Sequence, residues 1–123
     1  MLTPLPKHFV IERTLAEARR VGTPLVALES AVITHGLPRP ENLNLAREME
    51  AAVREEGAAP ATISLLDGKI HIGLDEEELQ RLANLDGTRK ISLRDFGIAL
   101  AQGLSGGTTV AATLFAASRA GIR

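Results

Sequence analysis

The sequence contains no cysteine, tryptophan or tyrosine, and its only aromatic residues are three phenylalanines. Without cysteine, the chain has no disulfide, zinc–thiolate site or cysteine nucleophile. Nucleic-acid binding relies on basic surfaces and stacking aromatic rings. The formal net charge here is only −1. We therefore expect no nucleic-acid partner, and the lack of cysteine is compatible with a cytoplasmic protein.

Long apolar runs are missing too. None approaches the length of about 20 residues that a membrane-spanning helix needs. The first nine residues lack the apolar stretch of a signal peptide. We therefore expect no membrane association and a cytoplasmic location.

The residues that are present favour an α/β fold. Apolar residues make up 45% of the 123 positions, and a core of Leu, Ile, Val and Ala suits packed α/β layers. Residues 1–9 are expected to be irregular. The hydrophobic pattern predicts helices at 11–21, 41–56, 76 onward, 93–102 and 109–118. It predicts strands at 25–28, 61–66, 69–72 and 89–92, and a further one starting at Ile122.

Two short sequence signals predict where one turn and one helix start lie. The pair Asp67–Gly68 predicts a hairpin turn, and Asp75 with Glu78 predicts a capping box at a helix start. We expect the N-terminal part of an α/β/α layered domain with a β-hairpin insertion. Because Ile122 resembles the start of another strand, residues 1–123 are expected to be the N-terminal part of one domain whose C-terminal part is absent, rather than a natural truncation.

Glu29 is the first candidate for chemistry. It follows the apolar run 25–28 and precedes a second apolar run, 31–33, so it stands at the carboxyl end of a predicted strand, where α/β proteins bind ligands. The chain beyond it either extends the strand or loops back. The carboxyl group is either a general acid or a helix cap or arginine partner. His35 either binds phosphate or tunes Glu29, or simply hydrogen-bonds its loop.

Two further segments could bind anions. Lys90 stands in a predicted strand, either as a substrate contact or as a solvated side chain beside Arg89 and Asp95. The segment from Gly106 to Val110 leads a glycine pair into a helix N-terminus, where free N–H groups attract anions. Its alternative interpretation is tight helix packing through small side chains.

Five ordered blocks carry a resemblance. They are Val-Ala-Leu-Glu-Ser (26–30), Thr-His-Gly-Leu-Pro-Arg-Pro-Glu-Asn (34–42), Gly-Ala-Ala-Pro-Ala-Thr-Ile (57–63), Lys-Ile-Ser-Leu-Arg-Asp (90–95) and Gly-Thr-Thr-Val-Ala-Ala-Thr (107–113). Together they resemble the N-terminal portion of the pseudouridine-5′-phosphate glycosidase family, also called the indigoidine synthase A-like family.

The resemblance implies reversible cleavage of the C–C glycosidic bond of pseudouridine 5′-phosphate to uracil and ribose 5-phosphate. This is a lyase reaction of nucleotide catabolism, also described as that of a glycosidase or hydrolase. It implies a homotrimer, a divalent metal, typically Mn²⁺, and a lysine that forms a Schiff base with the ring-opened ribose. The metal-binding aspartate and that lysine are expected beyond residue 123, so we expect no metal ligand in this chain.

The resemblance also assigns roles within the chain. Glu29 matches the glutamate that protonates the departing uracil carbon. Lys90 and Val110 match substrate contacts, and Thr108 and Thr109 are taken as substrate-binding with them. Two other functions stay open: a non-catalytic phosphate- or nucleotide-binding module that uses the segment from Gly106 to Val110, and a structural segment that associates through apolar surface.

Overall fold

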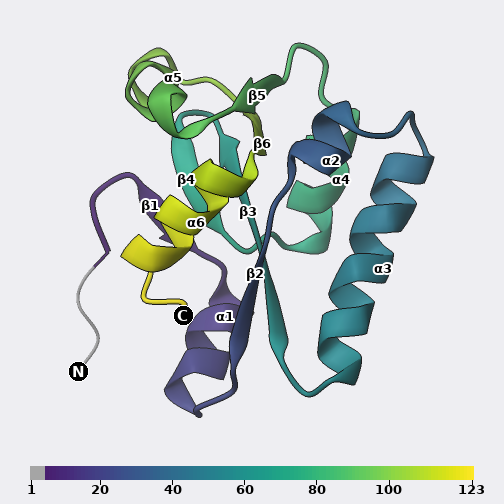
Figure 1. Cartoon of the computed structure of the whole chain (residues 1–123), viewed down its shortest axis with the longest axis vertical. Coiled ribbons are helices and arrows are strands. Elements are labelled where there is room, and N and C mark those ends of the chain that lie inside the picture. Colours follow the sequence, from purple (N-terminus) through teal and green to yellow (C-terminus); the bar gives the residue numbers. More distant parts are fainter. Residues whose placement is uncertain (1–4) are drawn as a thin grey trace.

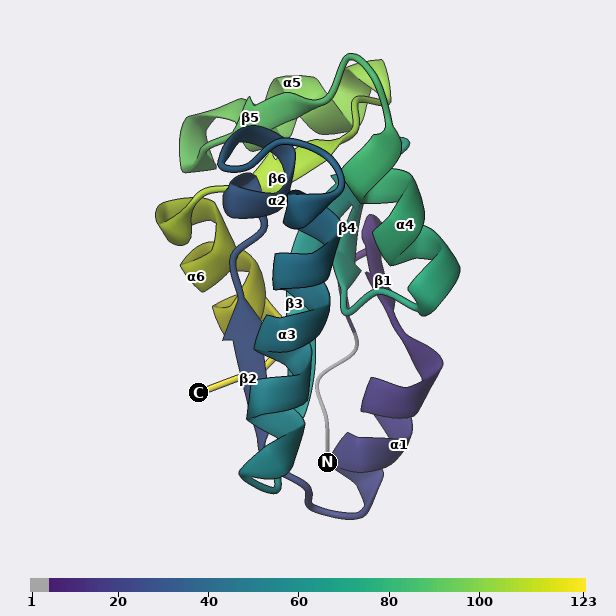
Figure 2. The same cartoon turned by 90° about the vertical axis from the view of Figure 1, so that its right-hand side faces the viewer.

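The computed structural model describes residues 5–123, which form a six-stranded mixed sheet with helices on both faces (Figures 1 and 2). The strands are β1 (Phe9–Ile11), β2 (Leu25–Leu28), β3 (Ala59–Leu66), β4 (Lys69–Ile72), β5 (Arg89–Ile91) and β6 (Gly106–Thr108). The helices are α1 (Arg13–Arg20), α2 (Ala31–His35), α3 (Glu41–Glu55), α4 (Glu76–Asn84), α5 (Phe96–Gln102) and α6 (Val110–Arg119), with a 3₁₀ turn at Leu93–Asp95. The predicted α/β class is confirmed.

Strand β3 is the centre of the sheet, which runs in the order β1-β4-β3-β6-β5, with β2 also paired to β3. The predicted hairpin is present, because β3 and β4 pair antiparallel. Asp67 and Gly68 both have positive φ, 52° and 73°, as a type I′ turn requires. The capping box of Asp75 and Glu78 at the start of α4 is confirmed as well.

Strands β2 and β6 lie end to end on the same edge of β3. Strand β2 pairs parallel with residues 59–62, and β6 pairs antiparallel with Ser64 and Leu65. The carbonyl of Thr62 faces the opposite edge, where it accepts from the N–H of Gly73 after β4. Since β2 runs parallel to β3 and β6 runs against it, the ends of the two strands approach each other (Figure 1). Their registers with Thr62 and Ser64 place the meeting point opposite Ile63.

The helices form two layers with different cores. Helices α1, α5 and α6 pack on one face, and α2, α3 and α4 pack on the other (Figure 2). The first core contains Leu15, Ala61, Ile63, Leu65, Ile70, Ile72, Ile91, Phe96, Ala99, Ala112, Ala116 and Ala120. The second contains Ile33, Ala46, Leu66, Leu74, Leu79, Leu82 and Ala83. The predicted α/β/α layering is therefore present.

The N-terminal prediction was wrong in part. Residues 1–9 were expected to be irregular; residues 1–4 lie outside the described part, but Phe9 begins strand β1. Ile11, predicted as helical, pairs with Ile72 of β4, so α1 begins only at Arg13. Val21, the last residue of the predicted helix, follows the end of α1 and is 59% exposed. Pairing with a distant strand overrides the local helical spacing here.

Further differences cluster around the predicted site. The chain after Glu29 forms the short helix α2 instead of a longer strand or a loop. The glycine-rich break before Thr108 contains strand β6, and α6 begins at Val110, one residue later than predicted. The predicted helix 93–102 divides into the 3₁₀ turn and α5. Ile122 and Arg123 belong to no strand. Among residues 5–123, no helix combines the length and apolar character of a membrane span.

Candidate active site

The carboxyl ends of β2, β5 and β6 meet at one place in the fold. The backbone N–H of Ser30, two residues after β2, donates to the carbonyl of Thr108 at the end of β6 (3.2 Å). The N–H of Thr109 donates to the carbonyl of Ile91 at the end of β5 (2.9 Å). These bonds bring Glu29 close to the start of α6, although 81 positions separate Glu29 from Val110 in the sequence.

A buried hydroxyl network holds this junction together. Ser30 Oγ donates to the carbonyl of Ile63 and accepts from the N–H of Thr108 (2.9 Å). Thr108 Oγ1 donates to the same carbonyl (2.9 Å) and lies 2.8 Å from Thr113 Oγ1. Ser30 and Thr108 are fully buried, and Thr113 is 5% exposed. Every hydroxyl proton in the network has an acceptor when Thr113 donates to Thr108, so the desolvated polar groups are paired.

Glu29 is half-buried beside this junction and caps helix α2. Its Oε1 accepts a hydrogen bond from the backbone N–H of Val32 (3.2 Å). The capping interpretation from the sequence is therefore realised. Capping engages only one carboxyl oxygen, so it is compatible with the role of proton donor, which stays a prediction.

The start of α6 is open to solvent on its outer side. Thr109 is the N-cap, and its Oγ1 accepts from the N–H of Ala112 (3.4 Å). Val110 is 63% exposed. The first N–H groups of a helix have no acceptor within the helix, so those of Val110 and Ala111 are available to an oxygen-rich ligand.

A groove of about 430 Å³ opens next to this helix start. It is lined by Ser92, Leu93, Arg94 and Ala111. Asp95 stabilises the position of Ser92, one of the residues that line the groove. Its Oδ2 atom accepts hydrogen bonds from the N–H (2.8 Å) and the hydroxyl (2.6 Å) of Ser92. These two bonds lower the pKa of the Asp95 carboxyl group below its usual range, so Asp95 is a fixed structural carboxylate here.

Lys90 lies on strand β5, in register with Gly107 of β6. Its side chain is exposed. One register position further along, Ile91 pairs with Thr108. The structure therefore brings Lys90 to the strand beside the junction, with its ammonium group in solvent and free to meet an anion.

The glycine pair serves close backbone packing. A Cβ atom at Gly106 would overlap the carbonyl oxygen of Arg89, and one at Gly107 would overlap the carbonyl oxygen of Ser30 and the hydroxyl of Thr34. The glycines therefore allow close packing, but within strand β6 rather than in a helix. This packing also explains why β6 can contain two glycines, which weaken strands in general.

Two predicted contacts need revision. Thr108 was expected to bind substrate, but its side chain is fully buried and its hydroxyl already has partners within the junction. Its geometry fits a role in holding the junction. His35 was expected in a turn; it ends helix α2, and its Nδ1 lies 2.7 Å from the hydroxyl of Thr34.

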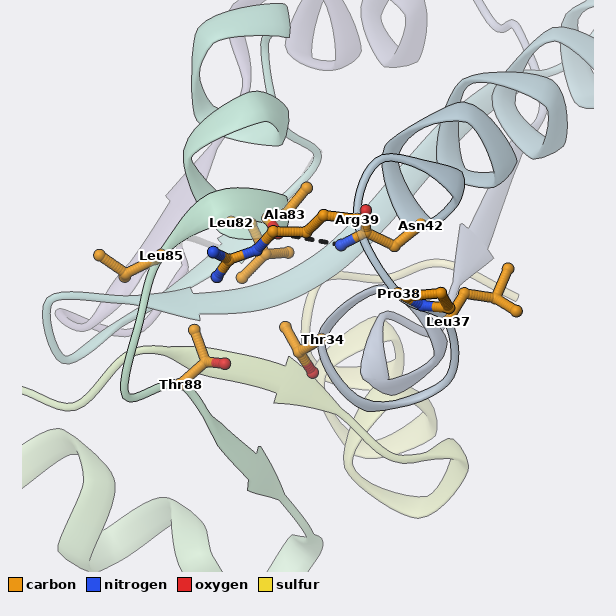
Figure 3. Close-up of a pocket in the computed structure, with 9 residues that line it drawn as sticks. All are labelled: Thr34, Leu37, Pro38, Arg39, Asn42, Leu82, Ala83, Leu85 and Thr88. Carbon is orange, nitrogen blue, oxygen red and sulfur yellow. Dashed lines mark hydrogen bonds between the residues drawn. The ribbon is translucent and has the colours of Figure 1, made fainter.

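A separate, partly open pocket of about 310 Å³ lies near α2 (Figure 3). Its walls come from the chain after α2, the first turn of α3 and the end of α4. Its polar groups are already engaged: the Asn42 amide donates to the carbonyls of Ile33 (3.0 Å) and Ala83 (2.9 Å), and Arg39 pairs with Asp86 (3.1 Å). Neither Glu29 nor Lys90 lines it, so we place the site at the junction instead.

Sequence reasoning missed Ser30 and Thr113. Ser30 stands in the block that carries Glu29, but its partners Ile63 and Thr108 lie 33 and 78 positions away. No spacing rule connects such distant positions. The only local signal was a small hydroxyl residue placed between two apolar runs.

Comparisons with known proteins agree with this architecture. A sequence model of the family described as indigoidine synthase A like protein matches residues 14–123. A protein from Salinispora tropica named pseudouridine-5′-phosphate glycosidase is 54% identical over 89% of this chain and 34% of its own length. One of the same name from a Jannaschia species is 56% identical over 96% of this chain and 38% of its own length.

Two solved structures have the same arrangement of elements. One is the prealnumycin C-glycosynthase in complex with ribulose 5-phosphate, with a TM-score of 0.82 and 42% identity over 96% of this chain and 38% of that one. The other is an indigoidine synthase A-like protein from Thermotoga maritima, with a TM-score of 0.81 and 37% identity over the whole of this chain and 40% of that one. The chain therefore spans less than half the length of each of these proteins.

Proposed function

This chain belongs to the indigoidine synthase A-like family, and we propose that it supplies the proton donor of a pseudouridine-5′-phosphate glycosidase. The reaction is the reversible cleavage of the C–C glycosidic bond of pseudouridine 5′-phosphate to uracil and ribose 5-phosphate. The names of the two curated relatives support it. So does the C-glycosynthase, whose structure holds a related pentose phosphate.

The observation that carries the proposal is the junction of β2 with β6. It brings a half-buried carboxyl group, Glu29, close to a helix start whose N–H groups at Val110 and Ala111 have no acceptor within the helix. A proton donor and a site for anionic oxygens are two of the parts that cleavage of a nucleotide C–C bond needs.

Glu29 acts on the leaving base. When the bond between C1′ and the uracil carbon breaks, its electron pair stays on the uracil carbon, which must gain a proton, while the nitrogen of the Schiff-base lysine outside these residues would supply electrons to C1′. Oε1 of Glu29 accepts from the N–H of Val32, so we assign the transferred proton to Oε2. The carboxylate that remains is stabilised by the same N–H donor and is reprotonated before the next turnover.

Lys90, Thr109 and Val110 bind the substrate. The exposed ammonium group of Lys90 attracts the 5′-phosphate or another anionic oxygen of the substrate. The backbone at Thr109 and Val110 contributes N–H groups and the positive end of the α6 dipole. Thr108 keeps this backbone in place from inside the fold.

The remaining parts of the reaction come from outside these residues. Among residues 5–123, no three His, Cys, Asp or Glu side chains come close enough together to hold a metal ion. The residues present therefore do not fit Mn²⁺, and no step here is routed through it. In this proposal the Schiff-base lysine is likewise none of the three lysines of the chain, Lys7, Lys69 and Lys90. We also propose that the full-length protein is a cytoplasmic homotrimer.

The direct test is Glu29→Gln in the full-length gene product. General acids contribute roughly 10²- to 10⁴-fold to rates, and we expect a loss of uracil release of that size while ribose 5-phosphate still binds. Glu48→Gln, at an exposed position of α3, is the matched control and should keep full activity. Unchanged turnover in Glu29→Gln would remove Glu29 from the mechanism.

A second candidate is a non-catalytic phosphate- or nucleotide-binding module. The solvent-facing start of α6 beside its groove favours it. It predicts that residues 1–123 alone bind ribose 5-phosphate or uracil nucleotides in calorimetry. Neither candidate expects the isolated chain to release uracil, so measurable release by it would contradict both.

A further inference from the structure

We infer that Ser30 is a positioning residue for the proton donor, because it fixes Glu29 relative to the start of α6. This inference rests on the proposed function. Ser30 joins the ends of β2 and β6 through three hydrogen bonds: its N–H donates to Thr108 O, its hydroxyl donates to Ile63 O, and its Oγ accepts from Thr108 N–H.

The direction of the Ser30 hydroxyl is unusual for its place in the chain. Ser30 occupies the N-cap position of α2, where a serine side chain normally accepts from an N–H of the first turn. Its hydroxyl makes no such bond and turns into the sheet. Glu29 performs the capping instead, through the N–H of Val32. The engagement of Ser30 with the sheet therefore leaves the first turn of α2 to Glu29, which orients the carboxyl group.

The two sides of the junction depend on Ser30 to different degrees. The start of α6 has a second anchor, because the N–H of Thr109 donates to Ile91 O on β5. Thr108 is also held by its own hydroxyl bonds to Ile63 and Thr113. Glu29 follows Leu28, the last residue of β2, which pairs with Thr62, and among the described residues its carboxyl group bonds only to α2. Ser30 is the anchor to the sheet on the other side of Glu29, at the start of α2. Loss of the Ser30 hydroxyl should therefore displace α2, and the Glu29 carboxyl group that caps it, more than Val110.

This asymmetry predicts a specific kinetic effect of Ser30→Ala. The substitution leaves the buried N–H of Thr108 without its acceptor, and the start of α2 then keeps only the backbone bond from the N–H of Ser30 to Thr108 O, as far as the described residues show. A displacement of about 1 Å at a reacting group can cost roughly a hundredfold in rate. We expect kcat for uracil release to fall about a hundredfold in the full-length gene product, with KM for pseudouridine 5′-phosphate little changed.

The matched control is Thr113→Val. Thr113 belongs to the same buried hydroxyl network but bonds only to Thr108, away from the Glu29 segment. Thr113→Val should lower the midpoint of thermal unfolding much as Ser30→Ala does, while kcat stays at the wild-type level. Equal loss of kcat in both variants, or wild-type kcat in Ser30→Ala, would show that Ser30 serves stability alone.

If Ser30→Ala does not fold, Ser30→Cys takes its place. A thiol keeps a weaker donor and acceptor near the position of Oγ, so this variant should recover the fold and lose a smaller part of kcat. Wild-type kcat in Ser30→Cys would then overturn the inference. Failure of the proposed function is distinguishable, because the wild-type protein would release no uracil at all.

Discussion

The two faces of the sheet are built on different principles. The face under α1, α5 and α6 is aliphatic, with Ile63, Leu65, Ile70, Ile72 and Ile91 at most 2% exposed. The face under α2, α3 and α4 carries polar side chains in its interior. They are Thr62, Ser64 and His71 from the sheet and Asn42 and Glu50 from α3.

The hydrogen bonds of the polar face fix the positions of the helices packed on it, which apolar packing alone does not fix. Thr62 donates to Glu50 (2.7 Å), and Asn42 ties the carbonyls of Ile33 in α2 and Ala83 in α4 together. Hydrogen bonds are directional, whereas hydrophobic contact is not. The aliphatic face therefore supplies most of the stability, and the polar face sets where α2, and with it the segment after Glu29, lies.

Leu65→Ala should have the largest effect on stability. Leu65 is fully buried in the aliphatic core, and truncation of such a side chain costs about 2–5 kcal/mol through lost burial and a cavity. Urea unfolding measures this loss. Leu114→Ala is the matched control, since Leu114 is 65% exposed and should change the free energy of unfolding by at most about 0.5 kcal/mol. Equal losses of unfolding free energy in the two variants would contradict the conclusion that Leu65 belongs to a stabilising aliphatic core.

Asn42→Ala should cost less, about 1–3 kcal/mol, because it removes the amide donor from the carbonyls of Ile33 and Ala83. Within residues 5–123, only the carbonyl of Ala83 keeps another side-chain donor, Arg39 Nε. Asn44→Ala, at an exposed position of the same helix, should be nearly neutral. The sharper test is amide hydrogen exchange: Asn42→Ala should loosen α2 more than α6. Uniform loosening of both helices would mean that the polar face does not position α2.

Acidification should have the smallest effect on stability of the three changes, and it should act through His71 on the polar face. Burial lowers the pKa of His71 below its ordinary value of about 6.5, against the raising effect of Glu78 and Asp67. The unfolded chain therefore binds the proton more tightly than the folded one, so stability is lost as pH falls through about 6.5.

The measurement is the free energy of unfolding between pH 7 and 5 in wild type and His71→Asn. The variant should have a flatter dependence on pH, and His35→Asn, at an exposed position, controls for general effects of the buffer. An identical slope in wild type and His71→Asn would exclude His71 as the source of the acid sensitivity.

Most of the regular elements could be predicted from local patterns. Strand β2, the hairpin of β3 with β4, helix α3 and the capping box of α4 follow from apolar runs, the pair Asp67–Gly68 and the pair Asp75–Glu78. Strands β1 and β6 could not, because they exist through their partners. Strand β6 starts with two glycines, which local propensity disfavours but which the close approach of Arg89 and Ser30 requires.

The residues of the site also divide into those that could be predicted from the sequence and those that could not. Glu29, Lys90 and Val110 could be proposed from ordered sequence blocks, and the structure places them around the carboxyl ends of β2, β5 and β6. The roles of Ser30 and Thr108 could not be proposed, because they depend on which edge of β3 each strand occupies. The pairing of strands that are distant in the sequence decides which edge each strand occupies, and no local sequence pattern reveals it.

The end-to-end meeting of β2 and β6 also has a consequence for folding kinetics. The hairpin of β3 and β4 closes across a two-residue turn, whereas Ser30 and Thr108 must meet across 78 positions. Loop-closure entropy makes such distant contacts form late. During synthesis, Glu29 leaves the ribosome well before its neighbour on β6 exists, so Glu29 acquires its final surroundings only after Thr108 has been added and docked.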